Sequence, residues 1–234
     1  MEISSCELYL FLRNIHYYEE GIYDIIKDLV LFKFNSNKEL KDAVDIWCED
    51  RERGLSLYGN ISLWNVSMIT NMYELFCFQS NFNDNINDWD VRNVKNMENM
   101  FETCYYFNQD LSTWNVDNVD NMFGMFYECR DFNQDISNWN THNITDMGFM
   151  FHNCFNFNQD ISKWDVSNVN CVSDMFYQCY KFNQDISNWD VRKVNEIEEM
   201  FKGCDNFKYD LSKWLLILQN EKDRNYIKYI SNRK

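Results

Sequence analysis

The chain has 234 residues, of which 45% are hydrophobic and 18% aromatic, and its formal net charge is −15. Disordered chains are poor in aromatic residues, so this composition predicts a folded protein with a buried core. The negative charge repels phosphate backbones and anionic lipid heads, and it therefore disfavours nucleic acids and membrane surfaces as partners.

The N-terminal segment, residues 1–56, is predicted to be helical and to cap the chain that follows. Ser36 and Glu39 have the spacing of a capping box, and Gly54 is the predicted helix stop. Apolar residues lie between them at helical spacing: Leu40, Ala43, Val44 and Trp47. Residues 1–34 are either a simple extension of this cap or a small helical module that docks a partner in the manner of an F-box.

The first residues of the chain lack the positive start and the apolar stretch of a secretory signal. The longest aliphatic run, Leu215–Leu218, is far shorter than the ~20 residues that span a bilayer. We therefore expect an intracellular protein without a membrane span.

Residues 57–211 repeat with a period of 25 residues, and six copies align without a gap. Such a period is typical of repeat architectures, in which stacked units share one core. The repeated apolar residues are the predicted core, namely Trp64, Trp89, Trp114, Trp139, Trp164, Trp189, Phe101, Phe126, Phe151, Phe176, Cys104, Cys129, Cys154 and Cys179.

Each repeat contains two apolar patterns. One has the spacing of a short amphipathic helix, as in Met97, Met100, Phe101 and Cys104. The other, around Trp-x-Val, alternates like a short strand and matches the leucine-rich spacing. The sequence therefore predicts an α/β fold, a leucine-rich-repeat-like right-handed solenoid with one short strand and one short helix in each coil. It would contain about six and a half coils, with helical caps at both ends.

The string from Phe132 to Asn140, with Met-Phe-x-x-Cys between its copies, resembles the BspA-type leucine-rich repeats. Those repeats occur in bacterial surface proteins, mycoplasma lipoproteins, protists and large DNA viruses. The resemblance covers about two thirds of the chain and extends upstream through residues 37–64. It implies a non-enzymatic binding surface, because family members of known role act in adhesion or host interaction.

Beyond the repeats, the Trp-Asp-Val pattern is broken at Trp214 by a run of aliphatic residues. Residues 212–234 are predicted to form a C-terminal capping helix from about Ser212 to Ile230. A terminal coil needs such a cover, because its core would otherwise face water.

Three columns of repeated residues each have two possible roles. The cysteines could ligate soft metals or form disulfides, but their place in the apolar stripe favours buried thiols in a reducing compartment. The tryptophans could stack on sugars, but their apolar spacing favours the core. The acidic column could bind calcium or accept hydrogen bonds from its own turns, and it comprises Asp110, Asp135, Asp160, Asp185 and Asp210.

The slot between Trp and Val points away from the core if this stretch is a strand, and the residue two positions later varies between repeats. We predict that this exposed strand face is the functional surface, with the loops at the coil edges as the alternative. Its residues are Asp90, Arg92, Asn115, Asp117, Asn140, His142, Asp165, Asp190 and Arg192.

These patterns predict a non-enzymatic, monomeric scaffold that binds another protein, with no catalytic residue, cofactor or metal. The three histidines have no repeated chemical setting, and the chain lacks a glycine-rich phosphate loop or a hydrolase motif. The alternatives are a carbohydrate- or calcium-binding surface protein and a solenoid hydrolase or lyase.

Overall fold

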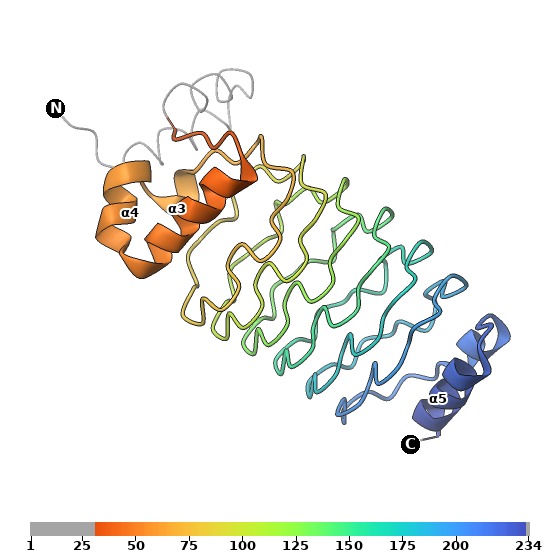
Figure 1. The fold of residues 1–234 in the computed structure, drawn as a ribbon. Coiled ribbons are helices and arrows are strands. Elements are labelled where there is room, and N and C mark those ends of the chain that lie inside the picture. The colour runs from red at the N-terminus through yellow and green to blue at the C-terminus, as the bar shows by residue number, and fades with distance from the viewer. Residues whose placement is uncertain (1–30, 233–234) are drawn as a thin grey trace.

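The computed structural model describes residues 31–232. A stack of 25-residue coils fills the middle, with helices at both ends (Figure 1). The helical elements are α3 (Asn37–Glu49), α4 (Arg51–Tyr58), α5 (Glu221–Ser231) and the short 3-10 helices η1 (Ile61–Leu63) and η2 (Ser212–Leu216). The possible docking module of residues 1–34 lies outside the described residues, apart from its C-terminal end.

The N-terminal cap begins where the sequence predicts. The Ser36 side chain caps α3 by accepting a hydrogen bond from the Glu39 N–H at 3.2 Å. The predicted apolar face of α3 is buried. The helix stop is not Gly54, because the chain turns at Asp50, which caps α4, and continues to Gly59 with φ 72°. Gly54 instead packs against Trp47, where an added Cβ would lie 3.0 Å from the Trp47 Cα.

The predicted helix in each coil is wrong. Met97, Met100, Phe101 and Cys104 are buried as their spacing requires, but the segment consists of tight turns. Asn99 has φ 53°, in the left-handed region, and the same slot is left-handed in every coil from Glu74 to Glu199. A right-handed helix cannot pass through such residues.

Hydrogen bonds between coils replace those of a helix. The N–H groups of Met97 and Asn99 donate to carbonyls of the next coil at 3.0 and 2.8 Å, whereas Met100 donates to Met97 of its own turn at 3.2 Å. This alternation satisfies the buried backbone without an i to i−4 ladder.

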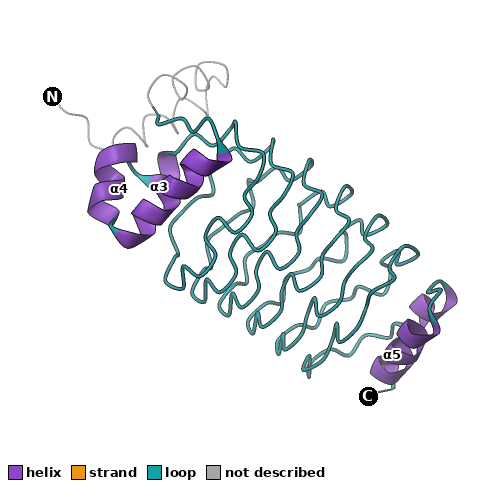
Figure 2. Cartoon of the chain, in the orientation of Figure 1, coloured by secondary structure: helices purple, strands orange, loops and turns teal. Residues whose placement is uncertain are grey.

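The predicted strand at Trp-x-Val is wrong as well. Between residues 31 and 232 the coils contain only isolated parallel bridges, and Figure 2 draws them as loops and turns throughout. One bridge joins Lys33 to Asn65, in the Trp-x-Val stretch of the first coil. The other bridges lie five residues beyond the Trp-x-Val valine, in a column that comprises Asn71, Asn96, Asn121, Asp146, Cys171 and Glu196. The α/β leucine-rich-repeat-like solenoid is therefore replaced by a stack of coils built from turns.

The core is a set of aromatic columns. None of the tryptophans from Trp64 to Trp214 is more than 4% exposed. Within each column, aromatic residues pack against the same residue type in the next coil. The rings of Trp139 and Trp164, for example, are stacked with centroids 6.4 Å apart. The Trp139 indole also donates to the Leu111 carbonyl of the preceding coil at 3.2 Å. The tryptophans are thus core residues, not a platform for sugars.

The cysteine column is buried in the same way. The Cys129 thiol donates to the Phe101 carbonyl of the preceding coil at 3.1 Å, and the other thiols of the column repeat this contact. Burial raises the pKa of the Cys129 thiol well above its usual value. Every cysteine from residue 31 to 232 is a free thiol.

A ladder of asparagine side chains joins the coils along one edge. The Oδ1 atom of Asn133 accepts from the Asn158 N–H at 2.8 Å, and the Asn133 N–H donates to the Asn108 Oδ1 atom at 2.9 Å. The slot changes to Lys208 in the last coil, where no repeat follows to be joined. The sequence therefore keeps Asn where the next coil needs an acceptor.

The C-terminal cap is two elements instead of the predicted continuous helix. η2 carries the buried Trp214, and α5 begins after Asn220, whose side chain accepts from the Lys222 N–H at 2.8 Å. The Tyr226 hydroxyl accepts a hydrogen bond from the Phe201 N–H at 2.7 Å. This contact satisfies a backbone donor that would otherwise need another coil.

We expect the Trp139→Ala variant to lose about 3–5 kcal/mol of unfolding free energy, because a buried indole is replaced by a cavity in the middle of the stack. Urea unfolding of the two proteins measures this difference. Tyr106→Ala is the control, since Tyr106 is 56% exposed; its effect should stay within about 0.5 kcal/mol. Equal effects of the two changes would contradict a buried tryptophan column.

The Asn133→Ala variant is expected to lose about 1–3 kcal/mol, because the Asn158 N–H is left without its acceptor. Lys208→Ala removes the side chain from the same slot of the last coil, so its unfolding free energy should change by less than about 0.5 kcal/mol. Thermal or urea unfolding of both variants measures these changes in unfolding free energy. It shows whether the asparagine side chains stabilise the stack or are ordinary surface residues. Similar losses at the two positions would show that the inter-coil bond contributes nothing.

Candidate binding surface

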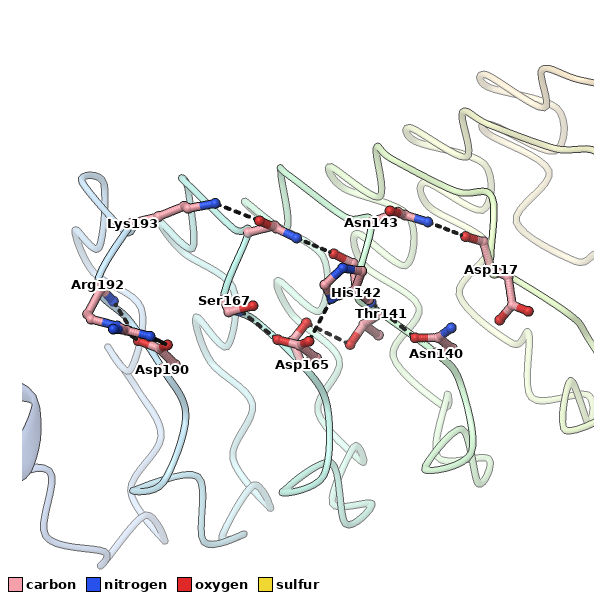
Figure 3. Close-up of polar contacts among 11 residues, drawn as sticks. Asp117, Asn140, Thr141, His142, Asn143, Asp165, Ser167, Asp190, Arg192 and Lys193 are labelled. Atoms are coloured by element: carbon pink, nitrogen blue, oxygen red, sulfur yellow. Dashed lines mark hydrogen bonds and ion pairs between the residues drawn. The ribbon is translucent and has the colours of Figure 1, made fainter.

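The predicted surface residues lie on a row of tight turns, one in each coil, along one edge of the stack. Each turn is closed by an Asn or Asp side chain that accepts the N–H two residues later; the Asp165 Oδ1 atom, for example, accepts from Ser167 at 2.9 Å (Figure 3). The same bond joins Asp90 to Arg92, Asn115 to Asp117, Asn140 to His142, and Asp190 to Arg192. We call this edge the turn row.

A second set of side chains ties each turn to the coil before it. The Nδ2 groups of Asn118, Asn143 and Asn168 donate to the carbonyls of Arg92, Asp117 and His142, each at 2.7 Å. The turn tips are therefore held both within and between coils. Side chains at the tips project from a fixed backbone, which lowers the entropy lost on binding.

The turn row is accessible, although it is not the strand face that the sequence predicts. The most open predicted residues are Arg92, Asn115, Asp117, Asn140, His142, Asp165 and Arg192, and Asp90 and Asp190 are half-buried. The physical reason for the difference is the Asx side chain, which bonds its own turn and so removes the backbone from a strand ladder. All nine residues nevertheless lie together on one edge.

Charge along the turn row varies from coil to coil. Asp90 and Asp190 each pair with the arginine two residues later. The His142 Nδ1 atom lies 2.8 Å from the Asp165 Oδ2 atom of the next coil. The Ser167 hydroxyl, the His142 ring and the Ser167 N–H together lower the pKa of Asp165 to about 2. Asp165 is therefore a carboxylate at neutral pH.

Thr141 strengthens the centre of the turn row. Its slot holds valine in the neighbouring coils, and its hydroxyl donates to the Asp165 carbonyl at 3.0 Å (Figure 3). The coils that carry His142 and Asp165 are thus joined by two contacts, one to the Asp165 carbonyl from Thr141 and one to the Asp165 carboxylate from His142. This part of the surface combines an imidazole, a carboxylate and the hydroxyls of Ser167 and Thr141.

The repeated aspartates have a structural role in their turns. Each Oδ1 atom of Asp135, Asp160 and Asp185 accepts the N–H of the serine two residues later at 2.9 to 3.0 Å. The serine hydroxyl and this N–H lower the pKa of each carboxyl. Across residues 31–232, no group of three or more Asp, Glu, His or Cys residues is placed to hold a metal ion.

Sequence reasoning missed the asparagine clamps of the turn row. Their signal is present, because the slot three residues after each Asx position holds Asn93, Asn118, Asn143 and Asn168. In the first coil the slot holds Met68, which has no preceding repeat to bond, and in the last it holds Lys193, whose Nζ atom donates to the Asn168 Oδ1 atom at 2.6 Å. A polar slot that changes only at an end of the array indicates a contact between repeats.

None of the helices within residues 31–232 has the length and apolar character needed to cross a membrane. Comparison with known proteins found no match among curated proteins or solved structures. A family model described as "Mycoplasma protein of unknown function, DUF285" matches residues 50–154 and 134–227, which together include all the repeats. The chain therefore belongs to the DUF285 family.

Proposed function

We propose that the protein is a non-enzymatic scaffold that binds another protein through the turn row. The observation that carries this proposal is the contrast between fixed and variable slots. The Asx slot is Asn or Asp in every coil and the clamp slot is Asn in four of them, whereas the tip between the two slots changes from Arg92 to Asp117, His142, Ser167 and Arg192. A rigid scaffold with varied exposed residues is how repeat proteins recognise partners.

The chemistry of the turn row also favours a protein partner. Arginine, aspartate and histidine at successive tips match a surface of mixed charge, which a uniform polyanion such as nucleic acid does not offer. The resemblance of the repeat to BspA-type repeats supports a binding role, because characterised members of that family act in adhesion or host interaction. A protein-binding scaffold accounts for the exposed tips without requiring a reaction.

Affinity capture with matched baits tests the proposal. The test bait carries Arg92→Ser, Asp117→Ser and Arg192→Ser, since serine already occupies this tip in two coils, at Ser67 and Ser167. The control bait carries Lys163→Ser, Asp131→Ser and Lys181→Ser, which remove the same charges from exposed positions elsewhere.

We expect a protein that is captured by the unchanged chain and by the control bait but lost with the test bait. The loss should follow from removing the charged tips alone, because the turns keep their backbone hydrogen bonds. If both baits retain the same captured proteins, the turn row is not the binding surface. Melting temperatures of the three baits must agree for the comparison to hold.

A further inference from the structure

A second surface lies in the turn segment where the helix was expected. Four slots of this segment face the outside, and each holds five or six residue types in the six coils. One coil has Glu98, Asn99, Glu102 and Thr103 there, and another has Gly148, Phe149, His152 and Asn153. The intervening slots are buried and keep their apolar character in every coil. We call this surface the variable face.

An aromatic cluster occupies the middle of the variable face. The His152 ring is stacked between Tyr127 and Tyr177, with both centroids 4.5 Å away and interplanar angles of 12° and 1°. The Phe149 ring lies 5.7 Å from His152 and 5.3 Å from Phe123. All five side chains are half-buried, so their outer parts remain open to a partner.

Phe149 occupies the slot that is left-handed in every coil, with φ 58°, where the preceding coils hold Asn99 and Gly124. A bulky aromatic residue is rare in this region of backbone conformation, so packing or binding of the ring must offset its cost. Gly148 beside it leaves room, because an added Cβ would lie 3.2 Å from the Phe123 ring.

Carboxylates surround the aromatic cluster. Besides burial, Glu128, Glu102 and Asp174 raise the pKa of the Tyr127 hydroxyl, which places their charges around this ring. Burial and Glu199 raise the pKa of the half-buried Asp174. Glu128 already pairs with Arg130 at 3.0 Å, so Glu102 and the half-buried Asp174 are the carboxylates that would attract an added cation.

The chain itself provides one example of a cation on this cluster. The Lys202 ammonium lies 5.3 Å from the centroid of Tyr177, at the C-terminal end of the stack. It also pairs with Glu199 at 2.9 Å. At the other end of the same column the slot before Tyr127 holds Glu102, a carboxylate. A lysine or arginine from another molecule would find there both an aromatic ring and an opposite charge.

We propose that the variable face docks a basic segment of a partner protein. The aromatic cluster contacts apolar and cationic side chains of this segment, and Glu102 and Asp174 pair with its charges. Charge complementarity defines the occupant, because the chain carries a net charge of −15 and the cluster is bordered by acids. The proposal is independent of the turn row, since it rests on different slots.

Titration calorimetry with two short synthetic peptides tests this assignment. One peptide alternates lysine and phenylalanine, and the other has the same length and alternates glutamate and phenylalanine. The unchanged chain should bind the basic peptide and not the acidic one. The Phe149→Asn variant should bind it about fivefold to tenfold more weakly, because an aromatic anchor is lost.

Matched variants separate a site from general attraction to an acidic protein. Asparagine already occupies the same slot at Asn99 with φ 53°, so Phe149→Asn is compatible with the fold. Glu102→Gln should weaken binding, whereas Asp88→Asn removes the same charge from an exposed position outside both surfaces and should leave binding unchanged.

Equal weakening by Glu102→Gln and Asp88→Asn would overturn the proposal, since only net charge would then matter. Binding of the acidic peptide as tightly as the basic one, or full binding by Phe149→Asn, would overturn it too. None of these results bears on the turn row, so either proposal can be refuted without the other.

Discussion

The structure depends on how the backbone divides its hydrogen bonds. Along the turn segment, one N–H donates within its own turn and the next donates to the following coil, as Met100 and Phe101 do with acceptors 3.2 and 2.9 Å away. This division requires left-handed residues at fixed slots, and it lets coils without helices or strands stay buried. The stacked rings and thiols then fill the space that the coils enclose.

The sequence predicts the period and the core but not the secondary structure. Met97, Met100, Phe101 and Cys104 have helical spacing, and turns that bury the same four side chains satisfy it equally well. The left-handed slots hold residues such as Thr103 and Phe149, not a repeated glycine, so no residue type reveals them. Local patterns report burial, whereas the bonds between coils, which decide the conformation here, join residues far apart in the sequence.

The candidate surface was predictable in part for the same reason. Slots that vary between repeats were identified beside the tryptophans, and they lie on exposed turns. The variable slots near Phe149 and His152 were hidden, because a helix assignment treats them as an ordinary solvated side. Their aromatic cluster emerges only when stacking places the His152 ring between Tyr127 and Tyr177, 4.5 Å from each. A column of unlike residues carries no sequence signal until the register is known.

The slots that change only at the ends, Met68 in the first coil and Lys208 in the last, have a consequence for how the chain arose and grows. Every internal coil offers its successor the same set of donors and acceptors that it receives. A gene segment encoding one period can therefore be duplicated or excised without breaking the joints on either side. The changed residues of the terminal coils set where the array ends, while the exposed residues of the coils between them are free to vary with the partner.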